Sequence, residues 1–297
     1  MRRTAAAIGR VLITVGLLLL LFVVYLLWGT GIYTAGQQHQ LRQEFDAALH
    51  QRAREKAKTE GSPVVGSTTT TTAPPSNASL AAGSAVARIQ IPKIGLDNIV
   101  VDGVGEEDLQ KGPGHYPLTP LPGQVGNSAI AGHRTTYGHP FGNVDQLSSG
   151  DVIRIQTLQG SFTYRVYAQL VVDPSDTAVL LPDPGRPATL TLTTCNPKYS
   201  AAQRLIIKAA LDPRVKPLPA PHIPPSAKLT SLGLSGDSGS VLPAVLFGLV
   251  VAAVGGAWWL LFRRHPRWTT WFIGVIPFLI ALYFFFQYLS RALPANY

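Results

Sequence analysis

Three long apolar segments lie near the two ends of the chain. The first, Val11 to Trp28, contains no charged residue, and the others extend from Val241 to Phe262 and from Trp268 to Leu289. Each has the roughly 20 apolar residues that an α-helix needs to cross a bilayer. The pattern predicts one N-terminal and two C-terminal transmembrane helices. Gly248, Ala252 and Gly256 recur every four residues, a spacing that lets helices approach closely in lipid but that also occurs in ordinary helices.

The charges beside these segments indicate their orientation. Arg2, Arg3 and Arg10 precede the first segment, as they would in a signal peptide, but GTGIYTAG after it offers no clear small-x-small cleavage site, which favours an uncleaved anchor. The turn 263–267, RRHPR, is basic and lies between tryptophans. Basic loops favour the cytoplasm, so we expect a multi-pass cell-membrane protein whose central region and tail 290–297 are extracytoplasmic.

The centre of the chain has a different pattern. A polar helical stretch with a stripe at Leu41, Phe45 and Leu49 is followed by a Thr/Pro-rich linker, and we expect a short stalk or a weak self-contact and a linker that lifts the next domain away from the membrane. Residues 84–212 then show short runs rich in β-branched residues, such as VARIQI and SFTYRVYAQLVV, bounded by Gly, Pro, Asp and Asn. Seven or eight such runs predict an all-β domain, either a closed barrel or a sandwich.

These patterns divide the chain into eight parts. The predicted parts are 1–33 (cytoplasmic N-terminus and anchor), 34–83 (polar helical stalk and linker), 84–212 (β domain), 213–240 (Pro/Gly/Ser-rich linker), 241–262 (transmembrane helix), 263–267 (basic cytoplasmic turn), 268–289 (transmembrane helix) and 290–297 (extracytoplasmic tail).

A net charge of +9 raises the question of a nucleic-acid partner. Six of the positive charges flank the predicted spans on their cytoplasmic side, and between Arg88 and Lys216 twelve basic residues nearly balance eleven acidic ones. The charge therefore reports membrane topology. We expect the membrane, and no nucleic acid, as a partner.

The chain has a single cysteine, Cys195, at the end of the run TLTLTTC. An odd thiol in an exported domain indicates a reactive group or an intermolecular disulfide, and a small buried filler is the alternative. Side chains alternate along a strand, so if Leu190 and Leu192 face the core, Cys195 points away from it. If the following run RLIIKA pairs antiparallel with this one, Arg204 lies beside Cys195, where a guanidinium lowers a thiol pKa and can bind an oxyanion. An exposed arginine at a strand end is equally compatible with the pattern.

A cysteine nucleophile generally needs a histidine partner, and the β domain offers three. His133 follows NSAIAG, a strand of small residues, whereas His115 and His139 lie in the turn-rich segments GPGHYP and YGHPFG. The spacing therefore favours His133.

Together these segments resemble one family. TLTTC fits the T-L-x-T-C signature of sortases, the cysteine transpeptidases that attach proteins to Gram-positive cell walls, Arg204 follows at a suitable spacing, and AGHR supplies the histidine. The resemblance covers Ala87 to Leu211. KGPGHYP, LPGQVGNSAIAGHRTTYGHPFGNVDQL and PSDTAVLLP are most similar to class E sortases of actinobacteria, with class D as the nearest alternative.

The resemblance implies a closed eight-stranded barrel and a defined reaction. Cys195 would attack the Thr carbonyl of an L-A-x-T-G or L-P-x-T-G sorting signal at the C-terminus of a secreted protein, giving a thioacyl enzyme. His133 would protonate the leaving Gly amine and then deprotonate the amine of a peptidoglycan precursor, and Arg204 would steady the oxyanion. Thr194 would support the substrate. Apart from the resemblance, the position of Tyr137 close to His133 in the sequence suggests that it lines the substrate groove, and an ordinary surface tyrosine is the default alternative.

Several features lie outside the family pattern. The two C-terminal spans are a departure, and the absence of a DP-aromatic lid motif before His133 does not support a pilin-polymerising role. Glu106, Glu107 and Asp108 could suggest a calcium site, but adjacent acids in a loop are more often solvated, so we expect no metal and no other cofactor. The alternatives to an enzyme are an inactive sortase-like scaffold or binding module tethered to the membrane, and a role for Cys195 in an intermolecular disulfide.

Overall fold

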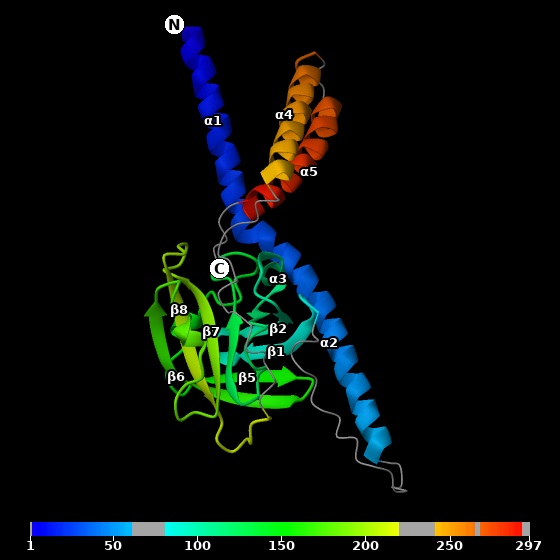
Figure 1. Cartoon of the computed structure of the whole chain (residues 1–297). Helices are drawn as coiled ribbons and strands as arrows, with labels where there is room; N and C mark the ends of the chain where they lie inside the picture. The colour runs from blue at the N-terminus through cyan, green and yellow to red at the C-terminus, as the bar shows by residue number, and fades with distance from the viewer. Residues whose placement is uncertain (1, 61–80, 220–240, 265–267, 293–297) are drawn as a thin grey trace. The chain divides into compact units, whose positions relative to one another are not determined.

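A computed structural model describes residues 2–60, 81–219, 241–264 and 268–292 (Figure 1). Most of both predicted linkers, part of the basic turn 263–267 and most of the C-terminal tail lie outside the described residues. The chain forms two compact units. One contains the helices at its two ends, and the other begins at Leu27 and contains the β domain.

The first unit consists of α1 (Arg2–Val24), α4 (Val241–Arg264) and α5 (Trp268–Ala292). Among the described residues, three helical stretches are long and apolar enough to cross a membrane: Leu12–Lys58, Val241–Arg264 and Trp271–Ser290. They overlap the three segments that the hydropathy pattern predicts. After α1 the chain continues through a π-helical turn, η1 (Tyr25–Gly29), directly into α2 (Thr30–Glu60).

The contact between α4 and α5 differs in detail from the predicted glycine seam. A Cβ atom at Gly248 would lie 3.2 Å from the ring of Phe285 on α5, so this position does face the neighbouring helix. At Gly256 such an atom would meet nothing within 4 Å, whereas at Gly255 it would lie 3.2 Å from another α5 ring. The glycines that face α5 are therefore Gly248 and Gly255, which are seven residues, or two helical turns, apart.

The β domain is a closed barrel of eight strands, as predicted (Figure 1). The strands are arranged in the order β1-β2-β3-β4-β7-β8-β6-β5. Two neighbouring pairs, β2–β3 and β4–β7, are parallel, and the others are antiparallel. The strands are β1 (Ala85–Ile91), β2 (Leu96–Asp102), β3 (Gly114–His115), β4 (Gly126–Ala131), β5 (Val152–Thr157), β6 (Gly160–Val172), β7 (Ala188–Asn196) and β8 (Gln203–Leu211). Short helices connect them: η3 (Pro92–Ile94), α3 (Glu106–Lys111), η4 (Val144–Gln146) and η5 (Thr177–Leu180).

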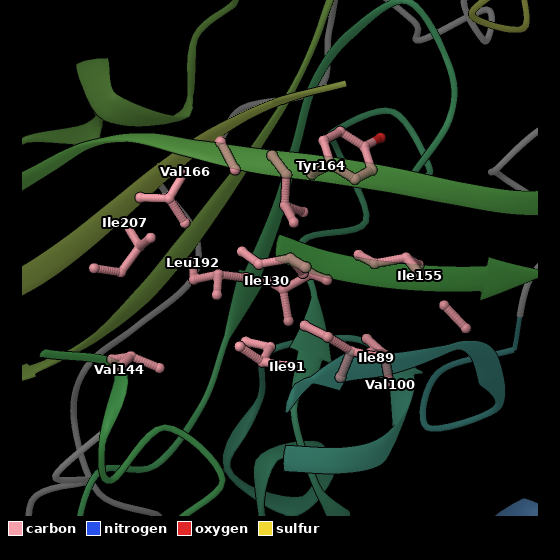
Figure 2. Packing of buried hydrophobic residues seen from close by; sticks show 14 of the residues in the cluster. Ile89, Ile91, Val100, Ile130, Val144, Ile155, Tyr164, Val166, Leu192 and Ile207 are labelled. Carbon is pink, nitrogen blue, oxygen red and sulfur yellow. The ribbon is translucent and has the colours of Figure 1, made fainter. Parts of the chain in front are cut away.

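Alternating apolar residues from the strands fill the barrel. Figure 2 shows Ile89, Ile130, Ile155 and Leu192, from β1, β4, β5 and β7, gathered in one buried cluster. The period of two that places these side chains inside sends their neighbours outward.

The acidic residues 106–108 form the first turn of α3, where negative charge is favourable at the positive end of the helix dipole.

The second unit also includes α2, which packs on the outside of the barrel. Leu41 and Phe45, 5% and 1% exposed, contact Ile99 and Val101 of β2. The sequence does predict the stripe, but the stripe packs on the β domain of its own chain and does not form a free stalk. The reason is that Ile99 and Val101 alternate with core residue Val100, so β2 is apolar on its outer face as well and needs a cover.

Candidate active site

Cys195 and Arg204 are direct partners in the antiparallel pair β7–β8. The Arg204 Nη1 atom lies 3.9 Å from Cys195 Sγ and donates hydrogen bonds of 3.1 Å to the carbonyls of Ala201 and Gln203. The predicted pairing is therefore confirmed. The pairing continues to Asn196 and Gln203, so the loop between the two strands consists of residues 197–202.

Cys195 is not a member of the apolar cluster that contains Leu190 and Leu192, but it is only 4% exposed. Burial disfavours the charged thiolate and raises the pKa of Cys195 above its ordinary value, while Arg204 and Arg134 lower that pKa by smaller amounts. Arg204 thus lowers the thiol pKa, as expected, but the opposite effect of burial is larger. Without substrate, the thiol is therefore mainly protonated at neutral pH.

His133 is brought level with Cys195 by the parallel pair β4–β7. Ala131 pairs with Thr193, and the Gly132 amide donates to the Thr193 carbonyl at 3.1 Å. His133 and Cys195, both buried, each lie two residues beyond this pair, Cys195 within β7 and His133 just past the end of β4. The structure thus gathers Cys195, Arg204 and His133 at the same ends of three neighbouring strands.

Two further predicted residues lie around the histidine. The ring of Tyr137 packs against that of His133, with centroids 4.9 Å apart. Thr194 is 2% exposed, and its hydroxyl donates a 2.7 Å hydrogen bond to the Gly132 carbonyl. Thr194 therefore ties β7 to the segment that carries His133.

The other two histidines of the β domain, His115 and His139, have different surroundings. His115 is fully buried, with Nδ1 3.3 Å from Asp102 Oδ1 and Nε2 3.0 Å from the Pro120 carbonyl, which indicates a structural role. His139 follows in the turn after Tyr137 and has a positive φ of 38°.

Arg134 is a site residue that the sequence patterns do not single out. It is 7% exposed, and its Nη1 donates to the Cys195 carbonyl and to Asn196 Oδ1, both at 2.9 Å. Its Nη2 lies 3.5 Å from Asp145 Oδ1. Its place directly after His133 is the signal that could have revealed it.

A cavity of about 250 Å³ adjoins Arg134. It is lined by Leu27, Trp28, Arg134, Thr135, His139, Gly142, Asn143, Lys198 and Tyr199.

The raised pKa of Cys195 predicts its reactivity toward alkylating agents. Only the thiolate reacts, so the rate of modification by iodoacetamide should rise with pH and reach its midpoint above that of free cysteine, whose ordinary pKa is about 8.5. Arg134→Met removes one of the two cations that stabilise the thiolate, so it should move the midpoint higher still. Intact-mass measurements on the full chain across this pH range test both shifts. A midpoint below that of free cysteine would mean that the two arginines outweigh the burial.

Known proteins match the β domain of this chain. A model of the sortase domain matches residues 89–212. Sortase SrtE1 of Streptomyces coelicolor is 32% identical over 215 residues, which cover 68% of this chain and 55% of that protein. Sortase D of Bacillus subtilis is 35% identical over 115 residues, which cover 39% of this chain and 56% of that protein. The chain thus spans little more than half the length of these two relatives.

Solved structures of similar sequence belong to the same group. Sortase E from Streptomyces avermitilis is 39% identical, with a TM-score of 0.40 and coverage of 44% of this chain and 90% of that chain. The Clostridium perfringens sortase D5 transpeptidase is 31% identical, with a TM-score of 0.48 and coverage of 60% and 99%. By its matched domain and its sequence identity to sortases E1 and D, this chain belongs to the sortase family of cysteine transpeptidases.

Proposed function

We propose that the chain is a membrane-anchored class E-like sortase. It cleaves an L-A-x-T-G or L-P-x-T-G sorting signal between Thr and Gly and transfers the protein to an amine of a cell-wall precursor, with its β domain on the extracytoplasmic side. The observation that carries this proposal is the cluster of Cys195, Arg204 and His133 at the ends of β7, β8 and β4. Three helical stretches of spanning length support the anchoring.

The first half of the reaction forms a thioacyl enzyme. The Cys195 thiol is mainly protonated because it is buried, so it needs a base, and we assign that role to His133. As Sγ bonds to the Thr carbonyl carbon, the thiol proton passes to the imidazole. The Arg204 guanidinium donates to the carbonyl oxygen as that atom gains negative charge. The C–N bond then breaks, and the imidazolium gives its proton to the leaving Gly amine.

The second half resolves the thioacyl enzyme. An incoming primary amine attacks the same carbonyl carbon, and His133 accepts the proton that the amine loses. The new C–N bond forms, the C–S bond breaks, and Cys195 recovers a proton from the imidazolium. Arg204 again donates to the carbonyl oxygen as that atom gains negative charge, so both halves use the same three side chains.

The test uses the full chain in detergent micelles. It is incubated with L-A-x-T-G and L-P-x-T-G peptides and a primary amine, and mass spectrometry detects cleavage between Thr and Gly and the amide product. A peptide with Thr and Gly exchanged is the control. We expect turnover of at least one sorting peptide and none of the control. Peptide binding without cleavage would instead favour the inactive binding module.

A further inference from the structure

We propose that helix α2 is a working part of the active site. Through Thr30 it positions the turn that carries Tyr137, and through Tyr137 it positions the His133 ring. Thr30 is thus a positioning residue for the reaction. This role rests on the proposed function, in which His133 is catalytic.

Three polar residues of α2 are buried against the β domain. Thr30, Thr34 and Gln38 are 1%, 3% and 9% exposed, and their spacing of four places them on one face of the helix. Because burying a polar side chain is unfavourable unless it is hydrogen-bonded, their partners show what this face recognises.

Two of these residues, Thr34 and Gln38, bind backbone groups of the β domain. Gln38 accepts a 2.7 Å hydrogen bond from the Ile99 amide and donates bonds of 2.9 Å to the carbonyls of Ile99 and Lys111. The Thr34 hydroxyl donates to the Gln110 carbonyl at 2.8 Å. These contacts hold α2 in a fixed register against β2 and the end of α3.

The first member, Thr30, reaches the active-site turn. Its hydroxyl oxygen accepts a 3.0 Å hydrogen bond from the Tyr137 amide. Tyr137, Gly138 and His139 have φ values of 50°, 71° and 38°, so three consecutive residues lie in the left-handed region. Non-glycine residues rarely adopt this conformation and hold it only where surrounding contacts determine it. The bond from Thr30 is one of those contacts.

The same turn holds the catalytic histidine. The Tyr137 ring packs against the His133 ring at 4.9 Å with an angle of 38° between the planes. Thr136 Oγ1 lies 3.3 Å from His133 Nδ1. A shift of Tyr137 would therefore change both the packing and the orientation of the imidazole that exchanges protons with Cys195 and the substrate.

The experiment compares three variants of the full chain in detergent. Thr30→Val keeps the shape but removes the acceptor, Thr30→Ser keeps the acceptor, and Gln38→Met removes docking bonds far from the turn. The readouts are kcat/KM on the cleaved peptide, Tm, and the His133 resonances in a ¹³C-histidine spectrum, identified by their loss in His133→Asn.

We expect Thr30→Val to shift the His133 resonances, as the Tyr137 ring moves, and to lower kcat/KM about tenfold, the effect of one lost buried hydrogen bond. Thr30→Ser should remain close to wild type in both. Gln38→Met should lower Tm while leaving the His133 resonances in place. Unchanged resonances in Thr30→Val, or an equal shift in Gln38→Met, would overturn the proposal.

The resonance readout also separates the two proposals. If the wild-type chain cleaves neither peptide, the proposed function fails, yet the His133 spectrum still shows whether Thr30 orders the histidine.

Discussion

Replacing Cys195 with alanine should abolish both turnover and the covalent intermediate. The chain contains no other thiol, so nothing else can form the thioacyl bond with the sorting peptide. In the wild type without an added amine, intact-mass measurement should reveal a population heavier by the acyl part of the peptide. In Cys195→Ala that population should be absent.

The control for this variant is a test of its folding, by Tm and by peptide binding. Alanine retains the Cβ atom and introduces no polar group at a position that is 4% exposed, so Tm should change little and peptide binding should persist. Residual cleavage at Cys195→Ala, with a normal Tm, would show that the thiol is not the nucleophile. A dimer that disappears with this substitution, in a chain without turnover, would favour the intermolecular disulfide.

Substitution of Arg204 should give the second-largest loss. Arg204→Met removes the guanidinium that lies 3.9 Å from Cys195 Sγ, and loss of one oxyanion donor lowers kcat by about 10²–10³-fold. Arg204→Lys keeps the charge but not the planar set of donors, so it should recover only part of the rate. Single-turnover measurement of thioacyl formation isolates this step from the later transfer.

Arg165 offers a matched control for Arg204. It lies on β6, the strand next to β8, with a side chain that is 51% exposed, and its ion pair with Asp212 is 4.0 Å long. Arg165→Met should therefore leave kcat unchanged. If Arg204→Met also left the rate of thioacyl formation unchanged, the oxyanion would have to be stabilised by other donors, and Arg134 would be the first to examine.

The sequence predicts the Cys195–Arg204 pair because the two strands follow each other along the chain. Alternation sets the direction of each side chain, and a short loop between strands sets the register. His133 is a different case. Its position depends on the parallel pairing of β4 with β7, two strands far apart in sequence, and no local pattern specifies such a pairing. Only the small residues before His133 and the family resemblance favour it over His115 and His139.

Two other findings depend on what covers a residue. Alternation predicts that Cys195 lies on the face of β7 opposite Leu190 and Leu192. It does not reveal that Cys195 is almost fully buried, or that burial raises its pKa. Similarly, the stripe on α2 and the consecutive apolar residues Ile99, Val100 and Val101 are both visible in the sequence. That these two features pack on each other is a long-range contact, and periodicity cannot pair them.

The docking of α2 also changes what the Thr/Pro-rich segment does. That segment follows α2 along the chain, and α2 is already held against the barrel by Gln38, Leu41 and Phe45. Along the chain, the segment therefore joins α2 to β1, two elements of the same unit. Because the entropy of closing a loop grows slowly with its length, adding or removing residues between α2 and β1 should change the stability of this unit only slightly.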